Sequence, residues 1–109
     1  MHPHNLPFVD IKLITDLQKA AFVRGKTILE IFSEAQGALH GRVSRSVFKN
    51  TIQDCSIWWS MADQDDLFNK LCEMEARGRN NEVDAQTIDE LVFFACKQKL
   101  RDMHKAMLV

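Results

Sequence analysis

Three cysteines and four histidines are the residues of this chain with the most versatile chemistry. A thiolate beside an imidazole can act as a nucleophile, and Cys55, Cys72 or Cys96 with His40 or His104 would supply such a pair. Cys72 and Cys96, however, fall on the apolar faces of predicted helices, where cysteine serves as a small buried hydrophobe. The cysteines show no Cys-x-x-Cys spacing, so we expect no disulfide and a reducing compartment.

Neighbouring carboxylates are the second candidate for catalytic chemistry. Asp63, Asp65 and Asp66 follow Ser60 closely, and acids at that place are usually solvated partners of a helix dipole. The chain contains no G-x-S-x-G, H-E-x-x-H, P-loop or dinucleotide-binding motif. We therefore expect no enzyme, no catalytic residue and no cofactor.

Composition narrows the classes of protein that remain. A chain of 109 residues is expected to form one domain, residues 1–109, with a core of modest size. The formal net charge of −1 argues against binding nucleic acid, which normally requires a basic excess. No run of about 18 apolar residues is present to span a membrane. The N-terminal residues lack the features of a signal peptide. We expect a cytoplasmic location, with the cytoskeleton as one candidate site.

The apolar periodicity predicts an all-α fold. Apolar residues recur at three-, four- and seven-residue steps, which is typical of amphipathic helices. Gly25 should break the first long pattern, because glycine is unfavourable inside a helix. Ser44, Ser60 and Asp84 are suitable N-caps for the later helices. The predicted helices are residues 11–23, residues 26–35, Ser44 to about Cys55, Ser60 to about Arg77-Gly78, and Asp84 onward to a tail near Met107.

The order of these elements carries a family resemblance. Residues 26–35 lead into Gly41-Arg42-Val43-Ser44, followed by Phe48, and Glu82-Val83-Asp84 repeats the pattern downstream before Thr87-Ile88. The linker Cys55–Asp63 resembles the segment that leads many such proteins into a second unit. The chain thus resembles an EF-hand pair of the calmodulin superfamily over about residues 17–96. The resemblance implies a paired helix–loop–helix lobe, with hands at about 26–55 and about 60–98, preceded by an extra helix.

In EF-hand pairs the two loops meet through very short strands. The resemblance places Val43 and Val83 at the eighth loop position, and both are β-branched residues suited to a strand. We therefore expect a very short two-stranded pairing of the loops through these two valines.

The first loop has lost the calcium ligands that the family uses. Calcium needs six to eight oxygen ligands, with a bidentate Glu at the twelfth loop position. With Gly41 at the sixth position the loop runs from Gln36 to Val47 and contains no Asp or Glu. Arg42 and Arg45 also add positive charge close to the place of a dication. We expect no calcium and no other metal in this loop.

The second loop leaves two registers open. It runs either from Ala76 to Thr87 or, one residue longer, from Glu75. Asn81 stands where Gly is expected, and Thr87 replaces the bidentate Glu. Glu75, Asn80, Glu82 and Asp84 could still supply oxygens for a weak site.

A four-helix lobe without an ion can still hold an amphipathic helix, as ion-binding lobes do. For each single candidate groove residue, packing in the core is the more frequent explanation, and the lobe could be fixed open or closed. For Trp58-Trp59 we expect that both cannot easily face inward, and an exposed Trp commonly marks an interface. The candidate partner-binding residues are Phe32, Phe48, Ile52, Trp58, Trp59, Leu71, Met74, Val92 and Phe93.

The functional hypothesis from the sequence is a calcium-independent EF-hand-like module. It would bind an amphipathic helix of a larger assembly, for example a cytoskeletal or motor complex. Two alternatives remain: a structural brace in a larger multidomain protein or enzyme, and an unrelated small helical adaptor.

Overall fold

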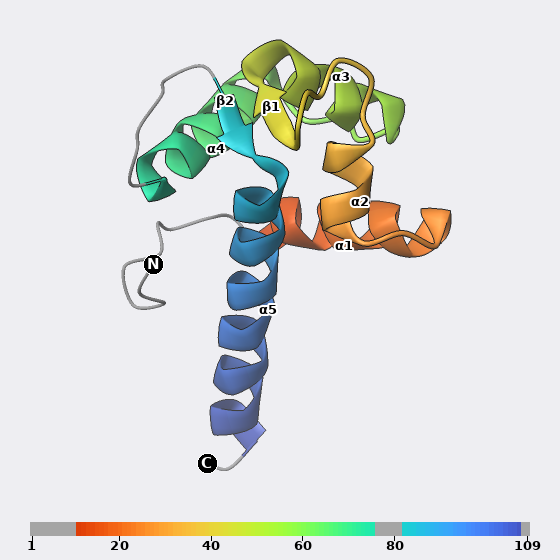
Figure 1. Cartoon of the computed structure of the whole chain (residues 1–109). Helices are drawn as coiled ribbons and strands as arrows, with labels where there is room; N and C mark the ends of the chain where they lie inside the picture. Colours follow the sequence, from red (N-terminus) through yellow and green to blue (C-terminus); the bar gives the residue numbers. More distant parts are fainter. Residues whose placement is uncertain (1–10, 76–81, 108–109) are drawn as a thin grey trace.

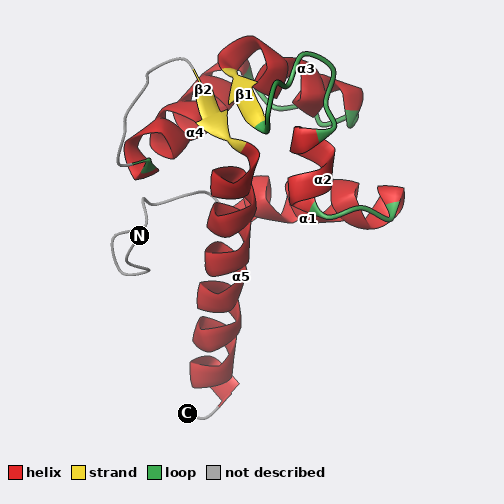
Figure 2. Cartoon of the chain, viewed as in Figure 1, coloured by secondary structure: helices red, strands yellow, loops and turns green. Residues whose placement is uncertain are grey.

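The computed structural model describes residues 11–75 and 82–107, and side chains only as far as residue 97. Within these residues the protein is mostly helical, with one two-stranded antiparallel sheet (Figures 1 and 2). The elements in chain order are α1 (Ile11–Arg24), α2 (Ile28–Ser33), β1 (Arg42–Ser44), α3 (Arg45–Asp54), α4 (Met61–Met74), β2 (Glu82–Asp84) and α5 (Ala85–Met107). A helix, a short strand and a second helix thus follow one another twice.

The break at Gly25 is confirmed. Gly25 has φ +62, the left-handed conformation that glycine adopts most readily and that ends a helix. The next helix, α2, is shorter than the predicted 26–35. Thr27 and Glu30 form a reciprocal capping box that starts this helix at Ile28, and Glu34 already caps its other end.

Serine side chains start α3 and α4 as predicted. Ser44 accepts a hydrogen bond from the backbone N–H of Val47, and Ser60 accepts one from that of Asp63. The predicted end of α4 near Arg77-Gly78 is wrong, because Glu75 already has an extended backbone, with φ −82 and ψ 124. The predicted tail does form, since α5 continues to Met107. Figure 1 shows its C-terminal half extending away from the other helices.

The two strands pair in the register that the sequence predicts. Val43 lies opposite Val83, and both side chains are fully buried. The pairing ties the start of α3 to the start of α5, although the two strands are separated by about forty residues.

The core fills the space between the helices. Phe32 stacks on Phe48 with ring centroids 5.6 Å apart, and Phe48 meets Phe68 at 5.5 Å, so α2, α3 and α4 share one aromatic cluster. Helix α1 adds a row of buried residues, Leu13, Ile14, Leu17, Ala20 and Ala21, and packs against α5 and α2. The protein therefore has one hydrophobic core shared by all five described helices.

Candidate functional site

The first loop is closed on itself by a tight turn. Leu39 and Arg42 exchange two backbone hydrogen bonds, of 3.2 and 2.9 Å, around His40 and Gly41. Both central residues have positive φ, 52 and 76, as a type I′ turn requires. In the calcium-loop numbering above, the carbonyl of Arg42 would be the backbone ligand of position seven. Here it accepts the N–H of Leu39 instead, so the turn occupies one of the oxygens that an ion would need.

The side chain of Arg42 reaches from the first loop into the second. Its Nη1 lies 3.2 Å from Glu75 Oε1 and 3.3 Å from Asp84 Oδ2, and its Nε lies 3.4 Å from Glu82 Oε1. Its Nη2 also donates to the backbone carbonyl of Glu82. One guanidinium thus faces three carboxylates that come from the end of α4 and from β2. We call these four residues the Arg42 cluster.

Burial and charge both act on Arg42. Partial burial works to lower its pKa, but attraction by Glu75, Asp84 and Glu82 outweighs this effect and raises the pKa above its ordinary value. The guanidinium therefore stays charged at neutral pH. Glu75, with a side chain 14% exposed, is the most buried member of the three pairs.

Glu75 also organises the start of α5. Its Oε2 accepts hydrogen bonds from the backbone N–H of Asp84 and from the hydroxyl of Thr87, the second at 2.8 Å. Its other oxygen contacts Arg42. A single carboxylate therefore connects the end of α4, the first loop and the first turn of α5.

The rest of the second loop, residues 76–81, lies outside the described residues, so both proposed registers are described only at their ends. The expectations for Asn80 and Asn81 fall in this segment. In the part of the chain that is described, no group of three or more His, Cys, Asp or Glu is arranged to hold a metal ion.

Most of the nine candidate partner-binding residues lie in the core. Six are buried, each 9% exposed or less: Phe32, Phe48, Ile52, Trp59, Leu71 and Val92. Met74 is half-buried against the same core. A partner could reach these residues only if the helices separated, so the described arrangement is a closed lobe. Trp58 and Phe93 remain on the surface, at 90% and 54% exposure.

The two adjacent tryptophans point in opposite directions, as expected. Trp59 packs against the core, and its indole N–H donates to Asp16 Oδ2 over 2.8 Å. Its backbone carbonyl accepts from the buried side chain of Gln64. Trp58 has no such support and is almost fully exposed. Trp59 therefore anchors the linker to α1 and leaves Trp58 as the exposed aromatic residue of the linker.

Four other chemical candidates from the sequence are accounted for by burial or by ion pairs. Cys72 is buried and Cys55 partly buried, and burial raises the pKa of both thiols, which opposes a nucleophilic role. Asp65 binds Arg45 and Lys49 of α3 rather than standing free in solvent. Asp66 pairs with Lys70 within α4.

Sequence reasoning placed Arg42 close to the site but missed its partners. It also missed Lys12, Lys19 and Val23, which lie on one side of α1 beside the exposed Trp58. Their spacing of four, three and seven residues from Asp16 is the signal that could have found them, because it places all four on one helix face.

No helix among the described residues is long and apolar enough to cross a membrane. No protein-family model, curated protein or solved structure matches the chain.

Proposed function

We propose that this chain is a calcium-independent EF-hand-like module that binds a helical segment of a partner protein in a larger assembly. The observation that carries the proposal is the Arg42 cluster. An arginine of one loop places positive charge beside carboxylates of the other loop. A bound dication would neutralise such carboxylates in the same way.

Two further features support the proposal. The helix–strand–helix order occurs twice, and the strands of the two units pair through Val43 and Val83. The lobe is closed over its own aromatic cluster, so an ion is not needed to fix its conformation. A lobe held in one state by its own packing would present the same surface to a partner at every calcium concentration.

Calorimetric titration with Ca²⁺ tests the calcium half of the proposal. We expect no saturable heat and no change in helical circular dichroism up to millimolar Ca²⁺, because the carbonyl of Arg42 is used and its guanidinium repels a dication. A micromolar transition accompanied by a change in helicity would overturn it.

Affinity capture from a cell lysate tests the partner half. The purified chain should retain the same partner in EGTA and in calcium. Capture seen only with calcium, or no specific capture in either buffer, would contradict the proposed function. The charge-reversal variant Lys97→Glu of α5 is captured in parallel as a control. It shows whether capture depends on basic surface residues in general.

A structural brace in a larger protein is the second candidate. The burial of most candidate groove residues favours it, because a closed lobe offers no interior for a partner. The projecting half of α5 could then dock on a neighbouring domain of the same polypeptide (Figure 1). Capture of a separate protein by the isolated chain would decide against the brace.

A further inference from the structure

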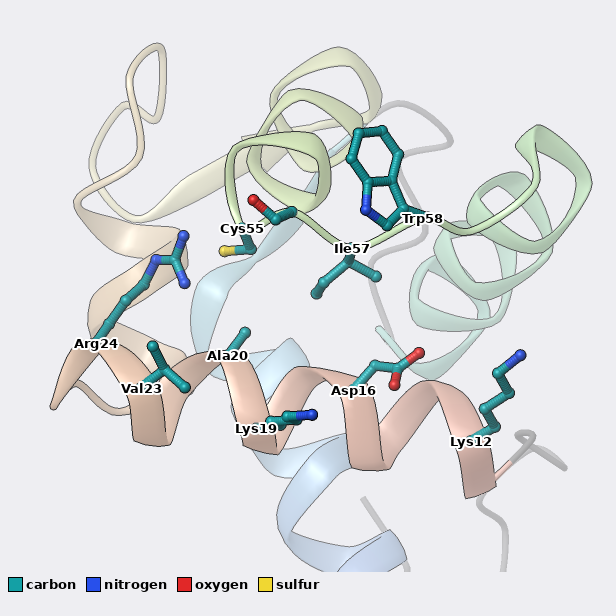
Figure 3. Close-up of a pocket in the computed structure, with 10 residues that line it drawn as sticks. Lys12, Asp16, Lys19, Ala20, Val23, Arg24, Cys55, Ile57 and Trp58 are labelled. Carbon is teal, nitrogen blue, oxygen red and sulfur yellow. The ribbon is translucent and has the colours of Figure 1, made fainter.

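A groove of about 570 Å³ lies between α1 and the linker that joins α3 to α4 (Figure 3). One wall is the side of α1 that carries Lys12, Asp16, Lys19 and Val23, and the other is the linker from Cys55 to Trp58. Along α1 the lining residues extend from Lys12 to Arg24, about 18 Å at the rise of an α-helix. We call this feature the α1–linker groove.

The groove combines a buried apolar floor with an exposed apolar rim. Ala20 and Ile57 are 7% and 8% exposed and form its floor. Val23 and Trp58, at 71% and 90% exposure, stand at its edges. An exposed Trp beside a hollow is the residue type that most often dominates binding energy at protein interfaces.

The ionisable side chains of the groove are mainly basic. The lining includes Lys12, Lys19 and Arg24 and one acid, Asp16, whose carboxylate accepts the indole N–H of Trp59. The whole chain has a net charge of −1, so this positive groove is a local feature. An occupant with negative charge beside an apolar stripe would complement both properties.

Two hydrogen bonds hold the walls at a fixed distance. Trp59 Nε1 donates to Asp16 Oδ2 over 2.8 Å near the middle of α1, and Arg24 Nη2 donates to the carbonyl of Asp54 over 2.9 Å at its end. Because these contacts join α1 to the linker and to the last residue of α3, the groove exists before any partner arrives. A preformed groove lowers the ordering that binding requires.

We propose that the α1–linker groove is the docking site for the partner helix, and that this helix is amphipathic with Asp or Glu beside its apolar stripe. This inference rests on the proposed function and moves its binding surface from the closed core to the outside of α1. A partner helix of about three turns would match the length of the groove. Trp58 and Val23 would cover its apolar stripe, and Lys12, Lys19 and Arg24 would meet its acids.

A synthetic helix tests the site directly. The probe is a capped peptide of roughly four turns built from Leu, Ala and Glu, with Leu on one face. Trp58 is exposed and Trp59 buried, so a shift of tryptophan emission to shorter wavelength on titration would report cover over Trp58. We expect saturable binding with a dissociation constant on the order of 10 μM, weakening as salt is added.

Variants of the full chain locate the binding. Lys19→Glu and Trp58→Ala should each weaken binding of a fluorescently labelled probe about tenfold or more. The matched controls are Lys97→Glu, a charge reversal on α5, and Phe22→Ala, which removes an aromatic residue that is 88% exposed but does not line the groove. Both controls should bind the probe as the unmodified chain does. The four positions are exposed, so their variants should keep the native circular dichroism.

Several outcomes would overturn the inference. Equal binding of a probe with Gln or Lys in place of Glu would remove the role of charge, and tighter binding of a single-stranded oligonucleotide would indicate a different class of partner. Dimerisation that Trp58→Ala abolishes would assign the groove to a second copy of the chain. If the lysate partner is retained equally by Lys19→Glu and Trp58→Ala, the groove is wrong and the proposed function stands. If the unmodified chain captures no partner, the proposed function itself fails.

Discussion

Arg42 shows how one residue can gather carboxylates from distant parts of the chain around a single cation. It places one delocalised positive charge among Glu75, Glu82 and Asp84. The planar guanidinium group can donate hydrogen bonds to several carboxylates at once. The sequence indicated positive charge at this place, because Arg42 follows Gly41 directly. It could not indicate the partners, since the three acids lie more than thirty residues away and meet Arg42 only when the strands pair.

Replacing Arg42 should therefore destabilise the protein. We expect Arg42→Ala to lower the free energy of unfolding by about 2–3 kcal/mol, because it leaves three neighbouring carboxylates without their shared cation. Arg42→Lys should recover part of this loss, since an ammonium keeps the charge but not the fork. Urea unfolding followed by circular dichroism measures both. The control is Lys26→Ala, whose exposed pair with Glu34 should contribute little to stability. Equal losses of stability for Arg42→Ala and Lys26→Ala would show that the Arg42 cluster stabilises the protein no more than an exposed ion pair does.

At the scale of elements, side-chain caps and cross-helix pairs decide where helices begin and how they meet. The caps at Ser44 and Ser60 could be predicted, because a serine directly before an apolar-periodic segment has a local meaning. The end of α4 could not, because Glu75 leaves the helix where its carboxylate contacts Arg42 and the start of α5. The acids after Ser60 were interpreted as solvated, yet Asp65 pairs with Arg45 and Lys49 across the contact between α3 and α4.

That contact gives the stability of the protein an acid-sensitive component. The hydrogen bond from Lys49 lowers the pKa of Asp65 most, and Arg45 lowers it further against partial desolvation. Because the folded-state pKa lies below the unfolded one, this contribution is complete above the unfolded pKa and is lost as the pH falls through the folded pKa. The urea midpoint should thus decrease between about pH 5 and about pH 3.

Asp65→Asn should reduce that decrease, because the amide cannot ionise in either state. Asp66→Asn is the control on the same turn of α4, since Asp66 pairs within its own helix rather than with α3. Urea titrations at a series of pH values compare the three proteins. If Asp65→Asn left the pH dependence of the urea midpoint unchanged, Asp65 would not be the source of that dependence.

For the whole molecule the question is how the apolar surface is divided between core and exterior. The mostly helical character, the first helix and the Val43–Val83 pairing could be predicted, because each depends on a local pattern or on the order of elements. The closed state of the lobe could not, because periodicity gives the apolar face of each helix but not the neighbour that covers it. Phe48 and Phe93 both stood among the candidate partner residues, yet the first is fully buried and the second 54% exposed. The groove was missed for the same reason, since it joins α1 to a linker more than thirty residues away.

The closed lobe makes a prediction that separates the core from the groove. Phe48→Ala should lower the free energy of unfolding by about 3–5 kcal/mol, because Phe48 has Phe32 on one side and Phe68 on the other. Phe93→Ala should change it by less than about 1 kcal/mol, because Phe93 is half-exposed and its near contacts are Phe94 and Lys97 of the same helix. Urea unfolding measures both. If Phe48→Ala instead left stability unchanged and abolished partner capture, the interior would be accessible to a partner, and the docking site would lie there rather than along α1.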